Sequence, residues 1–157
     1  MSSIENVYYG YGFSLENATN FKLIKEILIN NCKEYLTDDD CSSVISKIQQ
    51  FEPDNMWELI SLIESDLMLD TVSSIIANWM TYHEEYNPKH IYFGGYSADA
   101  DCGTEETIMF SMAYPWNYTE EEKYLTKDEL HRILLLFARD LGISEEEIDY
   151  QELHYYA

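Results

Sequence analysis

The order in which strand-like and helix-like hydrophobic patterns follow one another constrains the fold of this chain more than any other feature. Aromatic, β-prone stretches lie near both ends and around residue 100, and stretches with helical spacing lie between them. The expected strands are 6–15, 91–96, 106–113 and 147–156, and the expected helices are 20–32, from 40, from 54, from 70 and 126–142. This order predicts a single α+β domain over residues 1–157, a small antiparallel-rich sheet of about four strands covered by about five helices.

The clearest helix is expected between Thr126 and Gly142. Thr126 and Glu129 have the spacing of a capping box, and an apolar stripe follows them. Gly142 stands where a helix commonly ends with a left-handed glycine. The N-caps expected for the other helices are Thr19 or Asn20, Asp54 and Asp70.

The closing strand shows an irregular pattern. Ile148, Tyr150 and Leu153 do not alternate cleanly between two faces. The pattern therefore predicts a strand with a bulge near Gln151.

The charge of the chain is extreme. Its 157 residues include 30 acids and 9 bases, which gives a formal net charge of −21. Hydrophobic residues make up 46%, so the chain is not a disordered acidic tail. Such a balance disfavours direct contact with nucleic acids or anionic membranes, because their phosphates would be repelled, and it favours basic partners.

The cysteines and the apolar segments predict a cytoplasmic protein. Cys32, Cys41 and Cys102 are odd in number and form no CxxC pair, which suits a reducing compartment. The N-terminus lacks a basic stretch followed by an apolar run, so no signal peptide is expected. No apolar run approaches the ~18 residues of a membrane span.

The expected hairpin holds a compact acidic group at 99–106. An EF-hand loop beginning at Ser97 or Asp99 would lack both the turn glycine and the final bidentate acid. A divalent ion held by Asp99, Asp101, Glu105 and Glu106 remains an alternative, as does an acidic hairpin without a ligand.

No motif in the chain identifies a reaction. GxSxG, GxxxxGK[ST] and HExxH are absent. His83 continues the apolar stripe of the fourth helix and is interpreted as a core or boundary residue rather than a zinc ligand. We therefore expect a protein that is not an enzyme, with no catalytic residues, no resident metal and no cofactor.

The acids are concentrated in particular segments. Residues 37–70 hold nine acids and one base, residues 101–122 hold six acids and no base, and a further acidic run lies at 145–147. Two interpretations stay open: a solvated surface that keeps the protein soluble, and a set of carboxylates that mimics nucleic-acid phosphates. The second predicts these partner-binding residues: Asp38, Asp39, Asp40, Asp99, Asp101, Glu105, Glu106, Glu120, Glu121, Glu122, Glu145 and Glu146.

Five segments together resemble a family of small, uncharacterised bacterial and phage-borne proteins: YYGYGFSLEN, TVSSIIANWM, YFGGY, TIMFSMAYPWNYTEEEKYLT and LGISEEEIDYQELHYY. The resemblance covers the termini and most of 71–157 but leaves 33–70 unmatched, and YPW with the following TEEEKxLT is its most specific part. It implies no activity or catalytic residues. In size and charge the chain is also similar to anti-CRISPR and anti-restriction inhibitors of host defence.

Three functions follow as hypotheses. The first is an acidic inhibitor from a phage or mobile element that occupies the basic nucleic-acid-binding surface of a host defence nuclease. The second is a metal-dependent enzyme centred on the hairpin 99–106. The third is a housekeeping binding module whose acidity serves solubility alone.

Overall fold

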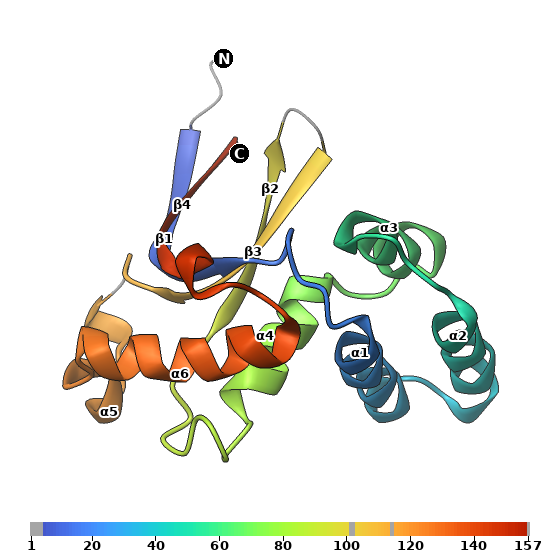
Figure 1. Cartoon of the computed structure of the whole chain (residues 1–157), viewed down its shortest axis with the longest axis horizontal. Coiled ribbons are helices and arrows are strands. Elements are labelled where there is room, and N and C mark those ends of the chain that lie inside the picture. Colours follow the sequence, from blue (N-terminus) through green and yellow to red (C-terminus); the bar gives the residue numbers. More distant parts are fainter. Residues whose placement is uncertain (1–4, 101–102, 114, 157) are drawn as a thin grey trace.

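A computed structural model describes residues 5–100, 103–113 and 115–156 (Figure 1). The strands are β1 (Glu5–Ser14), β2 (Gly94–Ala100), β3 (Gly103–Ser111) and β4 (Asp149–Tyr156). The α-helices are α1 (Phe21–Tyr35), α2 (Asp38–Gln50), α3 (Met56–Ser61), α4 (Val72–Thr81), α5 (Glu120–Lys123) and α6 (Lys127–Leu141). A π-helical turn, η1 (Leu62–Asp66), continues α3, and η2 (Pro115–Asn117) and η3 (Glu145–Glu147) are 3-10 turns.

The four strands form one antiparallel sheet in the order β2-β3-β1-β4. The first and last strands of the chain therefore pair with each other, and both described ends lie at the same edge of the molecule (Figure 1). The predicted α+β class, with an antiparallel sheet and covering helices, is confirmed.

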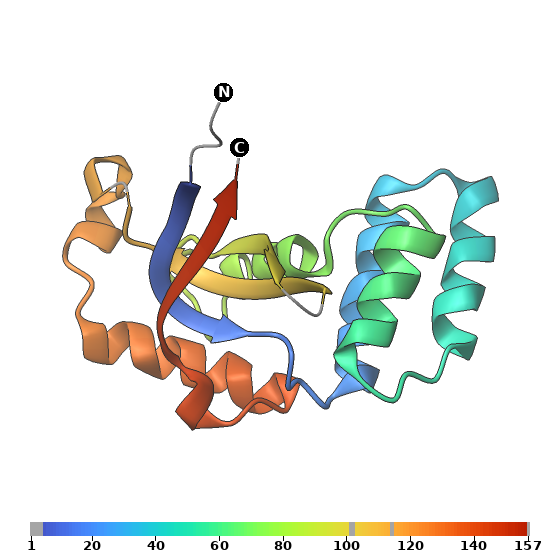
Figure 2. The same ribbon diagram turned by 90° about the horizontal axis from the view of Figure 1, so that it is seen from above.

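The pairing of β1 with β4 runs without interruption from Glu5 opposite Tyr156 to Gly12 opposite Asp149. The predicted bulge near Gln151 is therefore wrong, because Gln151 pairs directly with Gly10. Both strands are visibly curved (Figure 2).

The helices pack against one face of the sheet and extend beyond its end. The main core joins Phe13 and Phe110 of the sheet to Ile24 of α1, Ile76 of α4 and Phe137 of α6. Helices α1, α2 and α3 form a lobe at one end of the molecule, while α5 lies at the other (Figures 1 and 2). On the opposite face of the sheet Ala98, Met109 and Leu153 form a small separate cluster, against which Tyr8 and Tyr96 pack.

Two glycines are required by their surroundings. Gly142 ends α6 in the left-handed region at φ 76°, as predicted, and its N–H bonds the last turn of that helix. Gly95 of β2 lies against the backbone of Ser73 and Ser74, so a side chain there would collide with the first turn of α4. This close approach brings α4 directly onto the hairpin formed by β2 and β3.

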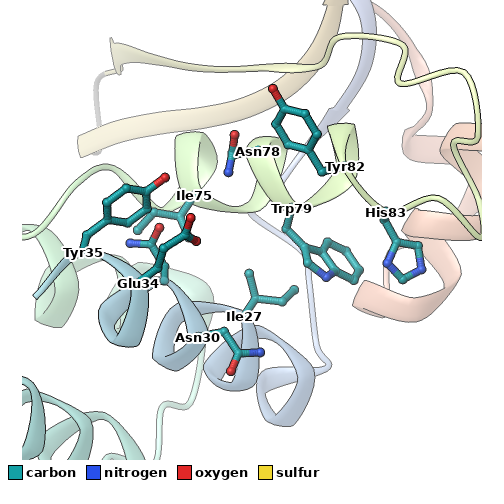
Figure 3. A pocket seen from close by; sticks show the side chains of 10 residues that line it. Ile27, Asn30, Glu34, Tyr35, Ile75, Asn78, Trp79, Tyr82 and His83 are labelled. Carbon is teal, nitrogen blue, oxygen red and sulfur yellow. The ribbon is translucent and has the colours of Figure 1, made fainter.

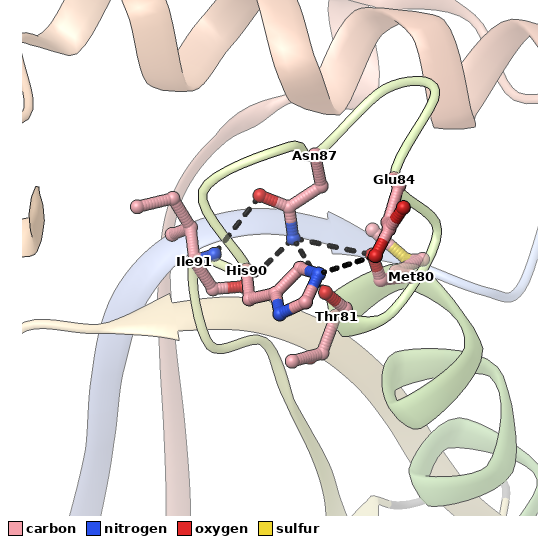
Figure 4. A network of polar contacts seen from close by, with 6 residues as sticks. All are labelled: Met80, Thr81, Glu84, Asn87, His90 and Ile91. Carbon is pink, nitrogen blue, oxygen red and sulfur yellow. Dashed lines mark hydrogen bonds and ion pairs between the residues drawn. The ribbon is translucent and has the colours of Figure 1, made fainter.

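The loop that follows α4 is organised by one buried amide, Asn87. Its Nδ2 donates to the carbonyls of Met80, Thr81 and Ile91 at 3.2, 3.1 and 2.9 Å, and its Oδ1 accepts from Ile91 N at 2.9 Å (Figure 4). Beside it, His90 Nε2 lies 3.4 Å from Glu84 Oε1. The loop is thus tied to the C-terminal end of α4 although it has no regular structure.

The boundaries of several elements differ from those predicted by local pattern. Asn20, one of the two expected caps, begins α1, but the caps of α3 and α4 are Asn55 and Thr71, each one residue after the expected acid. The hairpin strands extend to residues 100 and 103, well into the acidic stretch that was predicted to be its loop. Between the third strand and α6, where no helix was expected, the chain forms η2 and α5.

Among the described residues, no helix combines the length and apolar character needed to pass through a membrane.

Candidate protein-interaction surface

Seven of the predicted contact acids lie at the surface. They are exposed and belong to the first turns of α2 and α5 and to η3: Asp38, Asp39, Asp40, Glu120, Glu121, Glu145 and Glu146. Helices α2 and α5 lie at opposite ends of the long axis (Figure 1). The fold therefore does not bring all of these acids onto one face.

The chain supplies little positive charge to these surface acids. Glu120 pairs with Lys123 at 3.0 Å, and Glu145 lies 3.0 Å from His131. Within the described ranges, Asp38, Asp39 and Glu121 make no ion pair. Several carboxylates therefore stay free to meet cations from elsewhere.

Glu106, predicted as a partner-binding residue, does not lie at the surface. Glu106 lies within β3 opposite Ser97, and only 3% of it is exposed. Its Oε1 accepts from Ser73 N at 2.9 Å, in the first turn of α4. Because α4 packs closely on the hairpin, this carboxylate is covered and cannot reach a partner protein.

A second carboxyl group, Glu64 of η1, meets Glu106 at the same helix end. Glu64 Oε2 accepts from Val72 N at 3.2 Å, so the two acids bind the first N–H groups of α4 side by side. The pKa of Glu64 is raised to about 8, first by burial and then by the hydrogen bond and repulsion from Glu106, with the Val72 N–H acting in the opposite direction. Glu106 Oε2 accepts no hydrogen bond from the described groups. Because the pKa of Glu64 is about 8, Glu64 keeps its proton near neutral pH, and the pair then shares that one proton.

Glu122, also predicted as a contact residue, is likewise buried. Glu122 is 7% exposed and completes a capping box with Thr119 at the start of α5. Its other oxygen accepts from Tyr92 N at 2.9 Å. This side chain joins α5 to the segment before β2, and that structural task buries it.

The remaining predicted residues lie on the hairpin. Glu105 is half-buried in β3, where it pairs with Ala98. Asp101 and the side chain of Asp99 fall outside what the structure describes. The proposed metal-binding loop therefore cannot be completed from the described residues, among which no group of three or more His, Cys, Asp or Glu side chains could hold an ion.

A groove of about 530 Å³ lies between α1 and α4, and sequence reasoning did not find it (Figure 3). From α1 it is lined by Ile27, Asn30, Asn31, Glu34 and Tyr35. From α4 and the residues that follow, it is lined by Ile75, Asn78, Trp79, Tyr82 and His83. Its volume is in the usual range for a small-ligand or peptide side-chain site, about 300–1,000 Å³.

The groove combines an apolar floor with polar and aromatic walls. Ile27 and Ile75 are buried, whereas Tyr35 and Tyr82 are 67% and 64% exposed. Trp79 is held in place by ring contacts to Phe137 at 5.4 Å and to His83 at 4.9 Å. The groove forms because α1 packs against α4, and the residue spacing within either helix does not predict that packing. The one signal in the sequence is the presence of Asn and Tyr residues beside the apolar stripes of both helices.

The histidines occupy separate environments. His83 packs among Trp79, Tyr86 and Phe137, in agreement with its interpretation as a boundary residue. His131 lies between Tyr11 Oη at 2.7 Å and Glu145 at 3.0 Å, which links α6 to β1 and η3.

A scan against protein-family models and searches of curated proteins and of solved structures found no match to this chain.

Proposed function

We propose that this protein is a non-enzymatic, acidic interaction protein that binds a basic surface of another protein. Its specific role in this proposal is that of a phage or mobile-element inhibitor, anti-CRISPR-like, of a host defence nuclease. The nuclease surface that it occupies would be the one that binds nucleic acid. The resemblance to small phage-borne proteins and the cytoplasmic compartment belong to the same proposal.

The observation that carries the proposal is the set of exposed carboxylates that lack cations of the chain's own. Asp38, Asp39 and Glu121 have no ion pair among the described residues, and the formal net charge is −21. A basic groove that binds nucleic acid gains free energy from the release of counterions, and a folded surface of carboxylates can draw on the same gain. Cys32 and Cys41 are unpaired thiols, which suits a reducing compartment.

The first experiment captures the partner. The tagged full-length protein is incubated with host lysate at low and at high salt, and bound proteins are eluted with duplex DNA. We expect basic nucleic-acid-binding proteins that are retained at low salt, released at high salt and displaced by DNA, because screening weakens contacts between exposed charges. Capture that is indifferent to salt and to DNA would contradict the proposal.

The second experiment finds the contact face. One variant carries Asp38→Asn, Asp39→Asn and Asp40→Asn on α2. Its matched control carries Glu120→Gln, Glu121→Gln and Asp128→Asn at the other end of the molecule. Each removes three exposed charges, so the two separate a local contact from the general attraction of an acidic protein. We expect one of them to weaken binding about tenfold or more through slower association; if neither does, and a variant that combines both also binds normally, the proposed mode of binding is wrong.

A further inference from the structure

The groove between α1 and α4 has a distinct arrangement of chemical groups along its length. Glu34 and Tyr35 lie at one end, beside Ile75, and Trp79 and His83 lie toward the other (Figure 3). The two helices run in opposite directions past each other, so each end of the groove continues into a different connecting segment. The end beside Tyr35 leads to Asp38 of α2, and the end beside His83 leads to Glu84 and Glu85, which are exposed.

The walls offer acceptors for a cation and no competing cation. Among the described residues, no lysine or arginine lines the groove. Glu34 is exposed and makes no ion pair within the described ranges, and the neighbouring ring of Tyr35 is open to solvent. A carboxylate beside an aromatic face suits a guanidinium group, which pairs with the first and stacks on the second.

The walls also suit the backbone of an extended peptide. Asn30, Asn31 and Asn78 make no side-chain hydrogen bond to the described part of the chain. Each amide has both a donor and an acceptor, so it can pair with an N–H and a C=O of a bound main chain. The aliphatic stem of an arginine would lie on the buried Ile27, Ile75 and the half-buried Trp79.

We propose that this groove binds an extended, arginine-bearing segment of the partner protein. One guanidinium meets Glu34 and Tyr35, the asparagines bind the main chain, and further basic residues meet the acids beyond each end. The inference rests on the proposed function, in which the partner surface is basic. It identifies the groove as the part of this chain that binds that surface. Charge complementarity selects the occupant, because an acidic or neutral segment would leave Glu34 without a cation.

The test uses a labelled peptide of alternating arginine and alanine, about ten residues long, which spans about 35 Å when extended. A peptide with glutamine in place of arginine is the control for charge. Binding is measured by fluorescence anisotropy to the full chain, and side-chain amide signals are followed by NMR. We expect the arginine peptide to bind and to shift the side-chain amide signals of Asn30, Asn31 and Asn78, and the glutamine peptide to do neither.

Three variants test the site itself. Glu34→Gln should weaken binding of the arginine peptide about tenfold, and Tyr35→Ala about threefold, because a charge-assisted hydrogen bond and a cation–π contact are lost. Glu152→Gln, which removes the same charge at an exposed position on β4 outside the groove, should change it less than about twofold. Thermal melting confirms that each variant is folded, and all three positions are exposed.

The possible results separate the inference from the proposed function. Equal weakening by Glu34→Gln and Glu152→Gln, or no shift of the asparagine signals, would overturn the groove as the binding site while leaving the proposal of an acidic interaction protein intact. Failure of the arginine peptide to bind at low salt would also overturn it. Specific binding of the peptide without any basic partner captured from lysate would instead support the groove and contradict the inhibitor proposal.

Discussion

Asn87 is completely buried, and its amide satisfies three backbone carbonyls and one backbone N–H between α4 and β2. Asn87→Ala would leave those buried groups without partners, which costs about 2–4 kcal/mol in the free energy of unfolding. Urea unfolding followed by circular dichroism measures the change. Asn117→Ala, at an exposed position, should stay within about 0.5 kcal/mol of the wild type, and equal losses for both variants would show that the Asn87 network is not structural.

The Glu64–Glu106 pair predicts how stability depends on pH. The pKa of Glu64 is about 8 in the folded protein against 4.5 as its ordinary value, so the folded state holds a proton that the unfolded state releases. The stability from this proton is fully present below about pH 4.5, falls as the pH rises, and is lost by about pH 8. Glu64→Gln should therefore flatten the fall of the melting temperature over this range relative to the wild type.

The comparison with a surface variant isolates this pair from the other titrating groups. Glu121→Gln removes a similar charge from an exposed site, so its melting profile should run parallel to that of the wild type. Should Glu64→Gln also run parallel to the wild type between pH 5 and pH 8, the shared proton would have to be rejected.

At the scale of elements, β4 pairs with β1 along eight residue pairs and forms one edge of the sheet. Removing residues 147–157 would expose the backbone of β1 and remove the buried Ile148 and Leu153. We expect a loss of about 3 kcal/mol or more, measured by denaturant unfolding. Leu153→Ala by itself should lower the free energy of unfolding by about 2–3 kcal/mol. Glu152→Ala, at the exposed neighbouring position, is the control and should change it little. A truncated chain that melts like the full one would show that β4 does not contribute to the cooperatively folded core.

The helices were easier to predict than the acidic hairpin, because their signals are local. The start of α6 at Thr126 and its end at Gly142 depend on hydrogen bonds and backbone angles within a few residues. The strands β2 and β3 extend beyond the predicted limits because pairing with each other and packing under α4 override the polar character of their residues. The burial of Glu106 follows from the same long-range contact.

At the scale of the whole molecule, the net charge of −21 opposes its own compact state. Raising sodium chloride from about 20 mM to about 500 mM should raise the melting temperature by a few degrees, because screening weakens repulsion between exposed acids. The variant with Asp38→Asn, Asp39→Asn and Asp40→Asn should respond less, whereas Lys47→Gln should respond as much or more. A melting temperature independent of salt would mean that self-repulsion contributes little.

The sequence by itself determined the α+β class, the approximate positions of α1, α2, α3, α4 and α6, the stop at Gly142 and the acidic character of the molecule. Periodicity, capping and composition act within short stretches of chain, which is why these features could be predicted. Only the tertiary structure decided which acids face solvent and which hold the fold. Glu106 and Glu122 are buried because elements distant in sequence close over them, and the groove beside Glu34 exists because α1 packs against α4. These outcomes depend on contacts between segments far apart in the chain, which the spacing of residues within a single element does not specify.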